Sequence, residues 1–401
     1  MNNNTITSKP HYEILDGLRG IAALMILIFH IFETFTIGTN KNLIIGHGYL
    51  AVDFFFGLSG FVIGYAYDDR WNKMSLSTFI KRRLIRLHPM VIIGMTIGAA
   101  MFYTATSPNM FPNIAQTTPA QMLAYTILGI LMIPTPPSID IRGWREMYTM
   151  DAPVWSLLFE YTANILYATI IRRFNKTTLI TLVILAACAT IYQTTLTQGD
   201  VIGGWEFTRK HLQIGFTRLL YPFFAGLLLY RTIKPTQIKN TFPWCSLILI
   251  TILAIPRLGD KNHLWINGLY EATMIIIAFP AIIYLGANSK IKGQHTSKIC
   301  KTLGELSFPL YIIHYPIIYT FTAWVSNNNR TISTSIWQAA TVLLGSIAGA
   351  WIILKLYDEP VRNYLRKKFP DKPRKTPHPH NNKNQTHPNT PSKQTIKKHN
   401  Q

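Results

Sequence analysis

Apolar stretches long enough to cross a membrane recur along most of this chain, and they limit what it can fold into. About 20 consecutive apolar residues are needed for a helix to span the hydrocarbon core of a bilayer. Ten such runs lie near residues 14–35, 48–67, 86–106, 152–171, 178–196, 212–230, 243–257, 266–286, 303–325 and 334–357. Charged residues make up only 14% of the chain, well below the roughly 25% usual for soluble proteins. The sequence therefore predicts an all-α polytopic integral membrane protein.

Lysine and arginine are concentrated in alternate connections between these runs, and loops rich in these residues face the cytoplasm. The basic connections cover residues 70–86, 172–176, 231–239 and 289–301. A further apolar run at 120–133 is shorter and ends in PTPP, so it is either another span or an interfacial segment. A crossing there would put Arg172 and Arg173 outside. We therefore expect about ten transmembrane helices, both termini in the cytoplasm and a long outer loop at about 107–150.

The net charge of +21 would also suit a nucleic-acid-binding protein, but its distribution argues against one. From Arg362 onward, eleven lysines and arginines stand against one acidic residue, Asp371, among almost no apolar residues. Such a segment cannot bury a core. We expect residues 366–401 to be a disordered basic cytoplasmic tail that contacts the anionic inner leaflet, residues 1–11 a short cytoplasmic N-terminus, and residues 12–365 the transmembrane domain.

The three cysteines, Cys188, Cys245 and Cys300, have neither disulfide nor metal-ligand spacing. No metal is therefore expected. The first apolar run is too long for the core of a signal peptide, and no small-residue cleavage pattern follows it. It is expected to be retained as a helix.

The first run, YEILDGLRGIAALMILIFHIFETF at residues 12–35, carries ionisable residues at unusual depths. Arg19 and His30 are eleven residues apart, close to three turns, so both project from one helix face, roughly 16 Å apart along the axis. Ionisable groups inside a bilayer are costly and usually functional. An imidazole can accept a proton from a hydroxyl or act as a nucleophile. A packing role for His30 is the alternative, and Glu33 lies one turn beyond it.

Four other places carry polar residues with two readings each. Arg83 and Arg86 lie on one helical face and could bind an anion, or could mark a cytoplasmic helix start. Glu160 is either paired with a basic residue of another helix or faces an outer cavity. Asp53, at the outer end of the second run, is either interfacial or functional. His314 is either a hydrogen-bonded packing residue, which a lone histidine on an apolar face favours, or a catalyst.

Six segments together resemble the membrane-bound acyltransferase family 3. They are LDGLRGIAALMILIFH, VDFFFGLSGFVIG, RRLIRLHP, WSLLFEY, LSFPLYIIHYP and DEPVRNYL. They occur in the family's usual order and extend from residue 12 to about residue 365. Each segment alone is a weak signal, but six in order make a specific one.

The resemblance implies a ten-helix O-acyltransferase that acetylates cell-envelope sugars and takes acetyl-CoA from the cytoplasm. The family's essential histidine falls on His30 and its first-motif arginine on Arg19. Its arginine pair, which binds the phosphates of the donor, falls on Arg83 and Arg86. Polar positions of the family's motifs match Asp53, Glu160 and Tyr311. We predict His30, Glu160 and Asp53 as catalytic residues, Arg19, Arg83 and Arg86 as donor-binding residues, and Tyr311 and His314 as substrate-binding residues.

The expected partners are acetyl-CoA, an envelope glycan or glycolipid acceptor, and the lipid bilayer of the cytoplasmic (inner) membrane. The chain is expected to lack the added esterase-like domain of some relatives, and so to transfer the acyl group alone or with a separate periplasmic partner. His30 would be a general base, or a nucleophile that carries the acetyl group. The alternative function is a transporter or flippase of an envelope lipid or sugar, whose path the buried polar residues would line.

Overall fold

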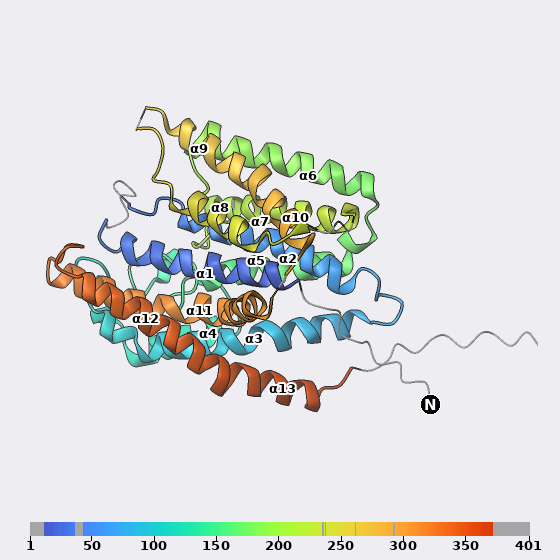
Figure 1. The fold of residues 1–401 in the computed structure, drawn as a ribbon. Helices are drawn as coiled ribbons and strands as arrows, with labels where there is room; N and C mark the ends of the chain where they lie inside the picture. The colour runs from blue at the N-terminus through green and yellow to red at the C-terminus, as the bar shows by residue number, and fades with distance from the viewer. Residues whose placement is uncertain are drawn as a thin grey trace, which may run out of the picture.

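The computed structural model describes residues 12–36, 43–234, 236, 238–260, 262–291 and 293–371. Nearly all regular structure in these ranges is helical, and the long helices lie roughly along one direction as a bundle (Figure 1). The helices are α1 (Glu13–Glu33), α2 (Ala51–Tyr67), α3 (Leu76–Ala100), α4 (Pro119–Ile130), α5 (Val154–Thr169), α6 (Lys176–Ile191), α7 (Arg209–Thr232), α8 (Phe242–Ala254), α9 (Leu264–Thr273), α10 (Phe279–Ala287), α11 (Gln294–Asn327), α12 (Ile336–Ile353) and α13 (Glu359–Lys368).

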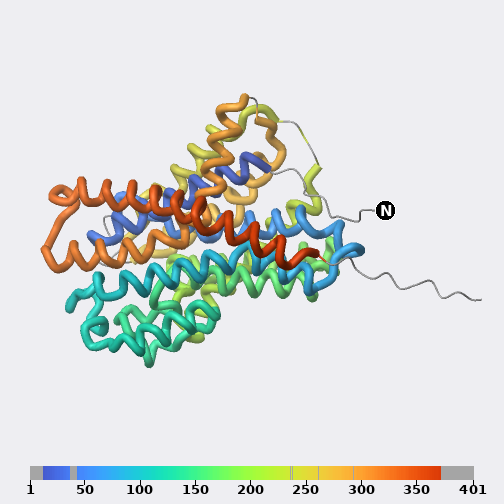
Figure 2. The backbone as a smooth tube through the Cα atoms, turned by 90° about the horizontal axis from the view of Figure 1, so that it is seen from below, coloured from blue at the N-terminus to red at the C-terminus, as the bar shows by residue number. Residues whose placement is uncertain are grey.

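Shorter elements extend or connect these helices. Three π-helical segments continue helices: η6 (Tyr192–Gln198) after α6, η7 (Met274–Ala278) between α9 and α10, and η8 (Leu354–Asp358) between α12 and α13. The 3-10 turns are η1 (Gly48–Leu50), η2 (Phe102–Ala105), η3 (Ile114–Gln116), η4 (Pro137–Ile139) and η5 (Ile171–Arg173). Two short strands, β1 (Ile238–Lys239) and β2 (Ser289–Lys290), pair in parallel. Figure 2 shows α12 and α13, in red, as one continuous rod along the bundle.

Seven helices within the described ranges are long and apolar enough to cross a membrane. They are α1, α2 with η1, α3, α6 with η6, α7, α9 continued through α10, and α12 continued through α13. The prediction of an all-α, multi-pass membrane protein is therefore confirmed. Of the other expected spans, α5 has 16 residues and α8 has 13, while α11 has 34 but is less apolar. The count of ten stays a prediction.

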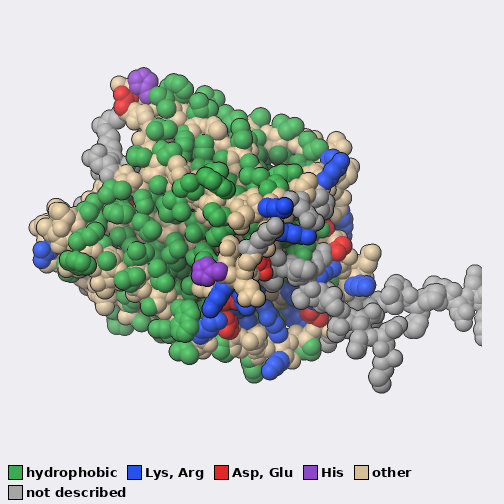
Figure 3. Space-filling model, in the orientation of Figure 1, with side chains coloured by type: hydrophobic (Ala, Val, Ile, Leu, Met, Phe, Trp, Pro, Cys, Tyr) green, Lys and Arg blue, Asp and Glu red, His purple; other side chains and the backbone are tan. Residues whose placement is uncertain are grey.

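The basic connections meet at one end of the bundle, which we call the basic end. Arg231, in the last turn of α7, binds Asp68 after α2 (Nε to Oδ2, 2.7 Å) and the carbonyl oxygen of Phe174 before α6 (Nη1 to O, 3.0 Å). Arg82, near the start of α3, binds Asp371 beyond α13 (Nη2 to Oδ2, 2.5 Å). Lysine and arginine side chains gather on this end of the surface (Figure 3). We expect this end to face the cytoplasm.

The shorter apolar run at 120–133 largely folds as α4. Its 12 residues span about 18 Å, less than the roughly 30 Å of a hydrocarbon core. Because α3 begins and α5 ends at the basic end, the connection that contains α4 lies at the opposite end. This geometry favours an interfacial segment over a further span.

The expected boundaries of the transmembrane domain, residues 12–365, can be compared with the described helices at its C-terminal end. Helix α13 continues to Lys368, three residues past the expected end of the transmembrane domain. Residues 1–11 and 372–401, which contain the expected N-terminus and most of the expected tail, lie outside the described residues.

Close helix approach at glycines holds the bundle together. Helix α1 packs along most of α11, and α2 packs along α7. A Cβ added at Gly60 of α2 would collide with the backbone carbonyl of Phe223 in α7, and one at Gly226 of α7 would collide with the carbonyl of Gly57. Small residues let helix backbones come this close in membranes. The α2–α7 pair in turn supports the start of α2, which borders the cavity described below.

We predict that Gly60→Ala destabilises the protein, because the new methyl group meets main-chain atoms that cannot rotate away. Overpacking of this kind costs about 1–3 kcal/mol, so the midpoint of thermal unfolding in detergent should fall. Gly345→Ala in α12 is the matched control, since no heavy atom lies within 4 Å of its added Cβ. Equal midpoints for Gly60→Ala and the unmutated protein would show that the helices do not pack as described.

Candidate active site

A cavity of about 510 Å³ lies at the end of the bundle opposite the basic end. Its walls come from the last turns of α1, the start of α2, the loops before α5 and before α7, and one face of α11. The polar and aromatic side chains that line it include His30, Glu33, Tyr49, Glu146, Arg218, Tyr311 and Tyr315. This mixture of aromatic rings with a few polar groups is typical of ligand-binding cavities.

His30 reaches this cavity from the last turn of α1, in a fixed orientation. Its Nδ1 lies 2.8 Å from Oε2 of Glu33. An ionised carboxylate can only accept, so we assign the proton to Nδ1, which leaves the lone pair of Nε2 available. The ring stacks on His314 (centroids 5.5 Å apart, planes at 28°) and meets the edge of Tyr315 at 4.8 Å. The imidazole, 14% exposed, is therefore a positioned base.

Two residues predicted to bind substrate lie on α11 near His30. His314 is fully buried, and its Nδ1 donates to the carbonyl oxygen of Leu310 (3.0 Å). It does not line the cavity, and Nε2 has no hydrogen-bond partner among the residues that the structure describes. Tyr311 does line the cavity, but its hydroxyl binds Ser156 Oγ (2.8 Å) and the carbonyl oxygen of Pro153 (3.2 Å). That hydroxyl ties α11 to the start of α5.

Arg19 lies on α1 toward the basic end and also contacts α11. Its Nε donates to Ser307 Oγ (2.8 Å), and its Nη2 donates to the carbonyl oxygen of Gly304 (3.0 Å). His30 stacks on His314 of the same helix. Both side chains therefore face α11, as the spacing of eleven residues predicts.

The three predicted donor-binding arginines come together from two helices. Arg86 is close enough to interact electrostatically with both Arg83 and Arg19. Arg83 is buried and binds Oε1 of Glu160 through Nη2 (2.6 Å), while its Nε has no partner among the described residues. Ser59 Oγ donates to the same carboxylate oxygen (3.3 Å). Glu160 is thus brought to the arginines and does not line the cavity that holds His30.

Asp53 forms a fully buried ion pair with Arg218 of α7, a residue that sequence reasoning missed. Nη2 of Arg218 lies 2.7 Å from Oδ2 of Asp53 and 2.8 Å from the carbonyl oxygen of Tyr49, and Nη1 lies 3.2 Å from the carbonyl oxygen of Gly203. Arg218 lines the cavity and Asp53 does not. The sequence signal that could have identified Arg218 is its position, as an arginine in the middle of the apolar run at 212–230.

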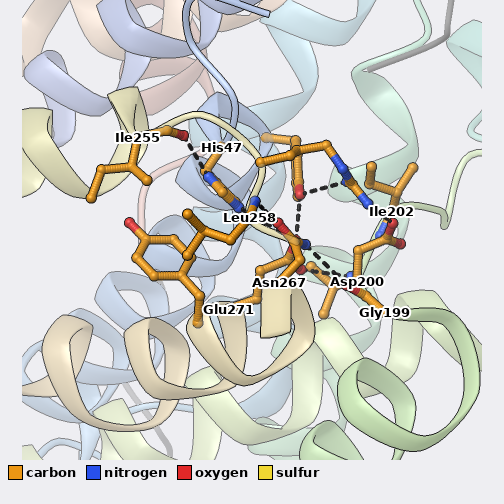
Figure 4. A network of polar contacts seen from close by, with 12 residues as sticks. His47, Gly199, Asp200, Ile202, Ile255, Leu258, Asn267 and Glu271 are labelled. Atoms are coloured by element: carbon orange, nitrogen blue, oxygen red, sulfur yellow. Dashed lines mark hydrogen bonds and ion pairs between the residues drawn. The ribbon is translucent and has the colours of Figure 1, made fainter. Parts of the chain in front are cut away.

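A second buried polar network closes one side of the cavity (Figure 4). Asn267 of α9 joins three elements: its Oδ1 lies 3.0 Å from Nε2 of His47, and its Nδ2 donates to Glu271 (2.7 Å) and to the carbonyl oxygen of Gly199 (2.9 Å). Tyr49, which lines the cavity, donates to Glu271. The network holds the start of α2, α9 and the loop after η6 together. Sequence reasoning missed it, although Asn267 and Glu271 interrupt an apolar run.

We predict that Arg218→Met lowers the free energy of unfolding by about 3–5 kcal/mol, because it leaves the Asp53 carboxylate buried and unpaired. Combining it with Asp53→Leu removes both charges and should recover most of the loss. Arg209→Met, an exposed position on the same helix, is the control. Denaturant titration of each purified variant measures the differences. A single variant as stable as the Arg209 control would contradict a buried ion pair.

The sequence of this chain is similar to known acyltransferase sequences. Residues 12–355 match the family model described as an acyltransferase domain. Protein 2 of the picA locus of Rhizobium radiobacter is 32% identical over 161 residues, which cover 39% of this chain and 80% of that protein. The peptidoglycan O-acetyltransferase OatA of Listeria monocytogenes is 22% identical over 396 residues, or 93% of this chain. The chain spans only 60% of that relative's length. No solved structure gives a significant match.

Proposed function

The chain belongs to the acyltransferase domain family, and from this premise we propose that it transfers an acetyl group from acetyl-CoA to a hydroxyl of an envelope glycan or glycolipid. The donor would bind at the basic end, on the cytoplasmic side of the inner membrane. The acceptor would enter the cavity at the opposite, outer end. One observation carries the proposal: α1 presents the positioned base His30 to that cavity and Arg19, toward the basic end, on the same face.

The arginine cluster supports a phosphate-bearing donor. Guanidinium groups bind phosphate oxygens through paired hydrogen bonds. Arg83 has a buried Nε without a partner among the described residues, and Arg86 lies beside it. Glu160 compensates part of this positive charge through Arg83. We assign Arg19, Arg83 and Arg86 to the donor, with Glu160 as a positioning residue for them.

At the reacting centre, His30 would act through Nε2. In the direct route, Nε2 takes the proton of the acceptor hydroxyl while the oxygen of that hydroxyl attacks the thioester carbonyl. The carbon–sulfur bond then breaks, and the imidazolium returns the proton to the thiolate. In the covalent route, Nε2 itself attacks the thioester, and the carbon–sulfur bond breaks to release the thiolate. The acceptor hydroxyl then attacks the acetyl group on Nε2, the carbon–nitrogen bond breaks, and the hydroxyl proton neutralises the thiolate. In both routes, Glu33 stabilises the positive charge that develops on the imidazole.

Two further observations support the roles of the cavity residues. Tyr311 and Arg218 line the cavity, and Asp53 holds Arg218 through its ion pair. We therefore assign Asp53 and His314 to positioning, the latter through its stacking on His30. The family match also argues against a transporter or flippase, which the buried polar residues alone would allow.

We predict that His30→Ala lowers acetyl transfer by at least about a hundredfold, the lower range for loss of a general base. The assay follows label from acetyl-CoA into the envelope glycans of isolated membranes. His263→Ala, in an exposed outer loop, should keep full activity. Near-normal transfer by His30→Ala would rule out the central role of this residue. Label that stays on the unmutated protein without acceptor, but not on His30→Ala, would select the covalent route.

We expect Arg86→Ala to raise the KM for acetyl-CoA about tenfold and to leave kcat nearly unchanged. Hydrogen bonds to the donor phosphates stabilise the bound ground state and the transition state equally. Lys367→Ala, an exposed basic residue at the same end of the bundle, controls for a general loss of positive charge. A fall in kcat alone would contradict the assignment of Arg86 to donor binding.

A further inference from the structure

Glu146 is a carboxyl group in the cavity wall that neither the sequence motifs nor the reaction above uses. It lies in the loop before α5, lines the same cavity as His30, and is only 4% exposed. Its Oε2 accepts a hydrogen bond from the Tyr319 hydroxyl (2.5 Å). Its other oxygen, Oε1, has no hydrogen-bond partner among the described residues. One oxygen is therefore anchored to α11, and the other is left for the cavity.

The nearest cation does not neutralise this carboxyl by hydrogen bonding. Nε of Arg142 lies 4.0 Å from Oε2 of Glu146. The guanidinium instead donates from Nε (3.1 Å) and Nη2 (2.9 Å) to the carbonyl oxygen of Thr149, and it lies 3.6 Å above the ring of Tyr319. Burial raises the pKa of Glu146 to about 8, although Arg142 and the Tyr319 hydrogen bond oppose the rise. At neutral pH the carboxyl is therefore mostly protonated.

The surroundings of Glu146 contribute charges of both signs. The loop before α5 contributes Asp140, Arg142, Arg145 and Asp151. Helix α1 contributes His30 and Glu33, and α11 contributes Tyr315 and Tyr319. Of these, Asp140 raises the pKa of Glu146, and the nearby Glu146 in turn raises that of the buried Asp151. Asp140 therefore adds to the effect of burial on the pKa of Glu146.

Tyr315 links Glu146 to the reacting centre. Its ring lies 4.8 Å from the ring of His30 and 4.7 Å from that of Tyr319, which holds Glu146. Glu146 and Glu33 both act electrostatically on its hydroxyl. Two aromatic rings, Tyr315 and Tyr319, thus separate Glu146 from His30, and both Glu146 and His30 line the same cavity. An acceptor that fills this cavity and reacts at His30 would therefore meet Glu146 with another of its groups.

We propose that Glu146 is an acceptor-binding residue, whose neutral carboxyl hydrogen-bonds through Oε1 to a second hydroxyl of the acceptor, further along the cavity from the one that reacts. This inference rests on the proposed function, and it narrows the acceptor to a polyol, such as a sugar that carries a second free hydroxyl. A neutral carboxyl both donates and accepts, as paired hydroxyls do. The anionic form can only accept and loses the donated bond.

The test compares Glu146→Gln, Glu146→Ala and Asp260→Asn, with envelope glycan stripped of its esters by mild alkali as the acceptor. Glu146→Ala should raise the acceptor KM at least about tenfold while the acetyl-CoA KM stays unchanged. Glu146→Gln keeps a neutral group that donates and accepts, so its acceptor KM should lie within about threefold of the unmutated protein at pH 7. Asp260 is an exposed carboxylate in an outer loop, and its variant should behave as the unmutated protein.

The pH profile gives a readout that a purely structural role would not move. Because the carboxyl ionises above about pH 8, acceptor kcat/KM of the unmutated protein should fall as the pH rises through that value. Glu146→Gln should lose this alkaline fall and Asp260→Asn should keep it, even if Glu146→Ala does not fold. An alkaline fall that persists in Glu146→Gln would overturn the proposal, as would an unchanged acceptor KM in Glu146→Ala. No transfer by the unmutated protein would instead reject the proposed function, and this inference with it.

Discussion

The packing of α1 against α11 is the contact on which the rest of the site depends. A Cβ added at Gly20 of α1 would collide with the backbone of Leu303, and one at Gly304 of α11 would meet Asp16. This close approach lets Arg19 hydrogen-bond to Gly304 and lets His30 stack on His314 of α11 about three turns further along. A helix that met α11 through larger side chains would separate both groups from their partners.

Two ion pairs compensate charged groups within the bundle, and His30 differs from them in what its side chain can do. Asp53 is paired with Arg218, and Glu160 with Arg83, each at hydrogen-bond distance. Buried charges without such partners cost several kcal/mol. His30 donates a hydrogen bond from Nδ1 to Glu33, and it lines the cavity with Nε2 free of any hydrogen-bond partner among the described residues. The ion pairs build the site, and His30, which lines the cavity and is held in a fixed orientation, is the group suited to chemistry there.

Sequence reasoning located the helices because each apolar run is a local signal. It also placed Arg19 and His30 on one face, since helical periodicity alone decides that. It could not find Arg218 or Glu146 as cavity residues, because their neighbours come from distant parts of the chain. For the same reason, Glu160 could be named as a functional candidate from its motif, but only the tertiary fold brings it to Arg83. The start of α3 at Leu76, ten residues before the apolar run, was obscured by the basic residues of its first turns.

The central claim is that donor and acceptor reach His30 from opposite sides of one membrane. Closed vesicles of known orientation, prepared from the host and supplied with labelled acetyl-CoA outside, test it most directly. Inside-out vesicles should acetylate the glycan in their lumen, protected from added esterase until detergent opens them, and right-side-out vesicles should incorporate almost no label. Equal incorporation by right-side-out vesicles, or product open to esterase in intact inside-out vesicles, would contradict the account.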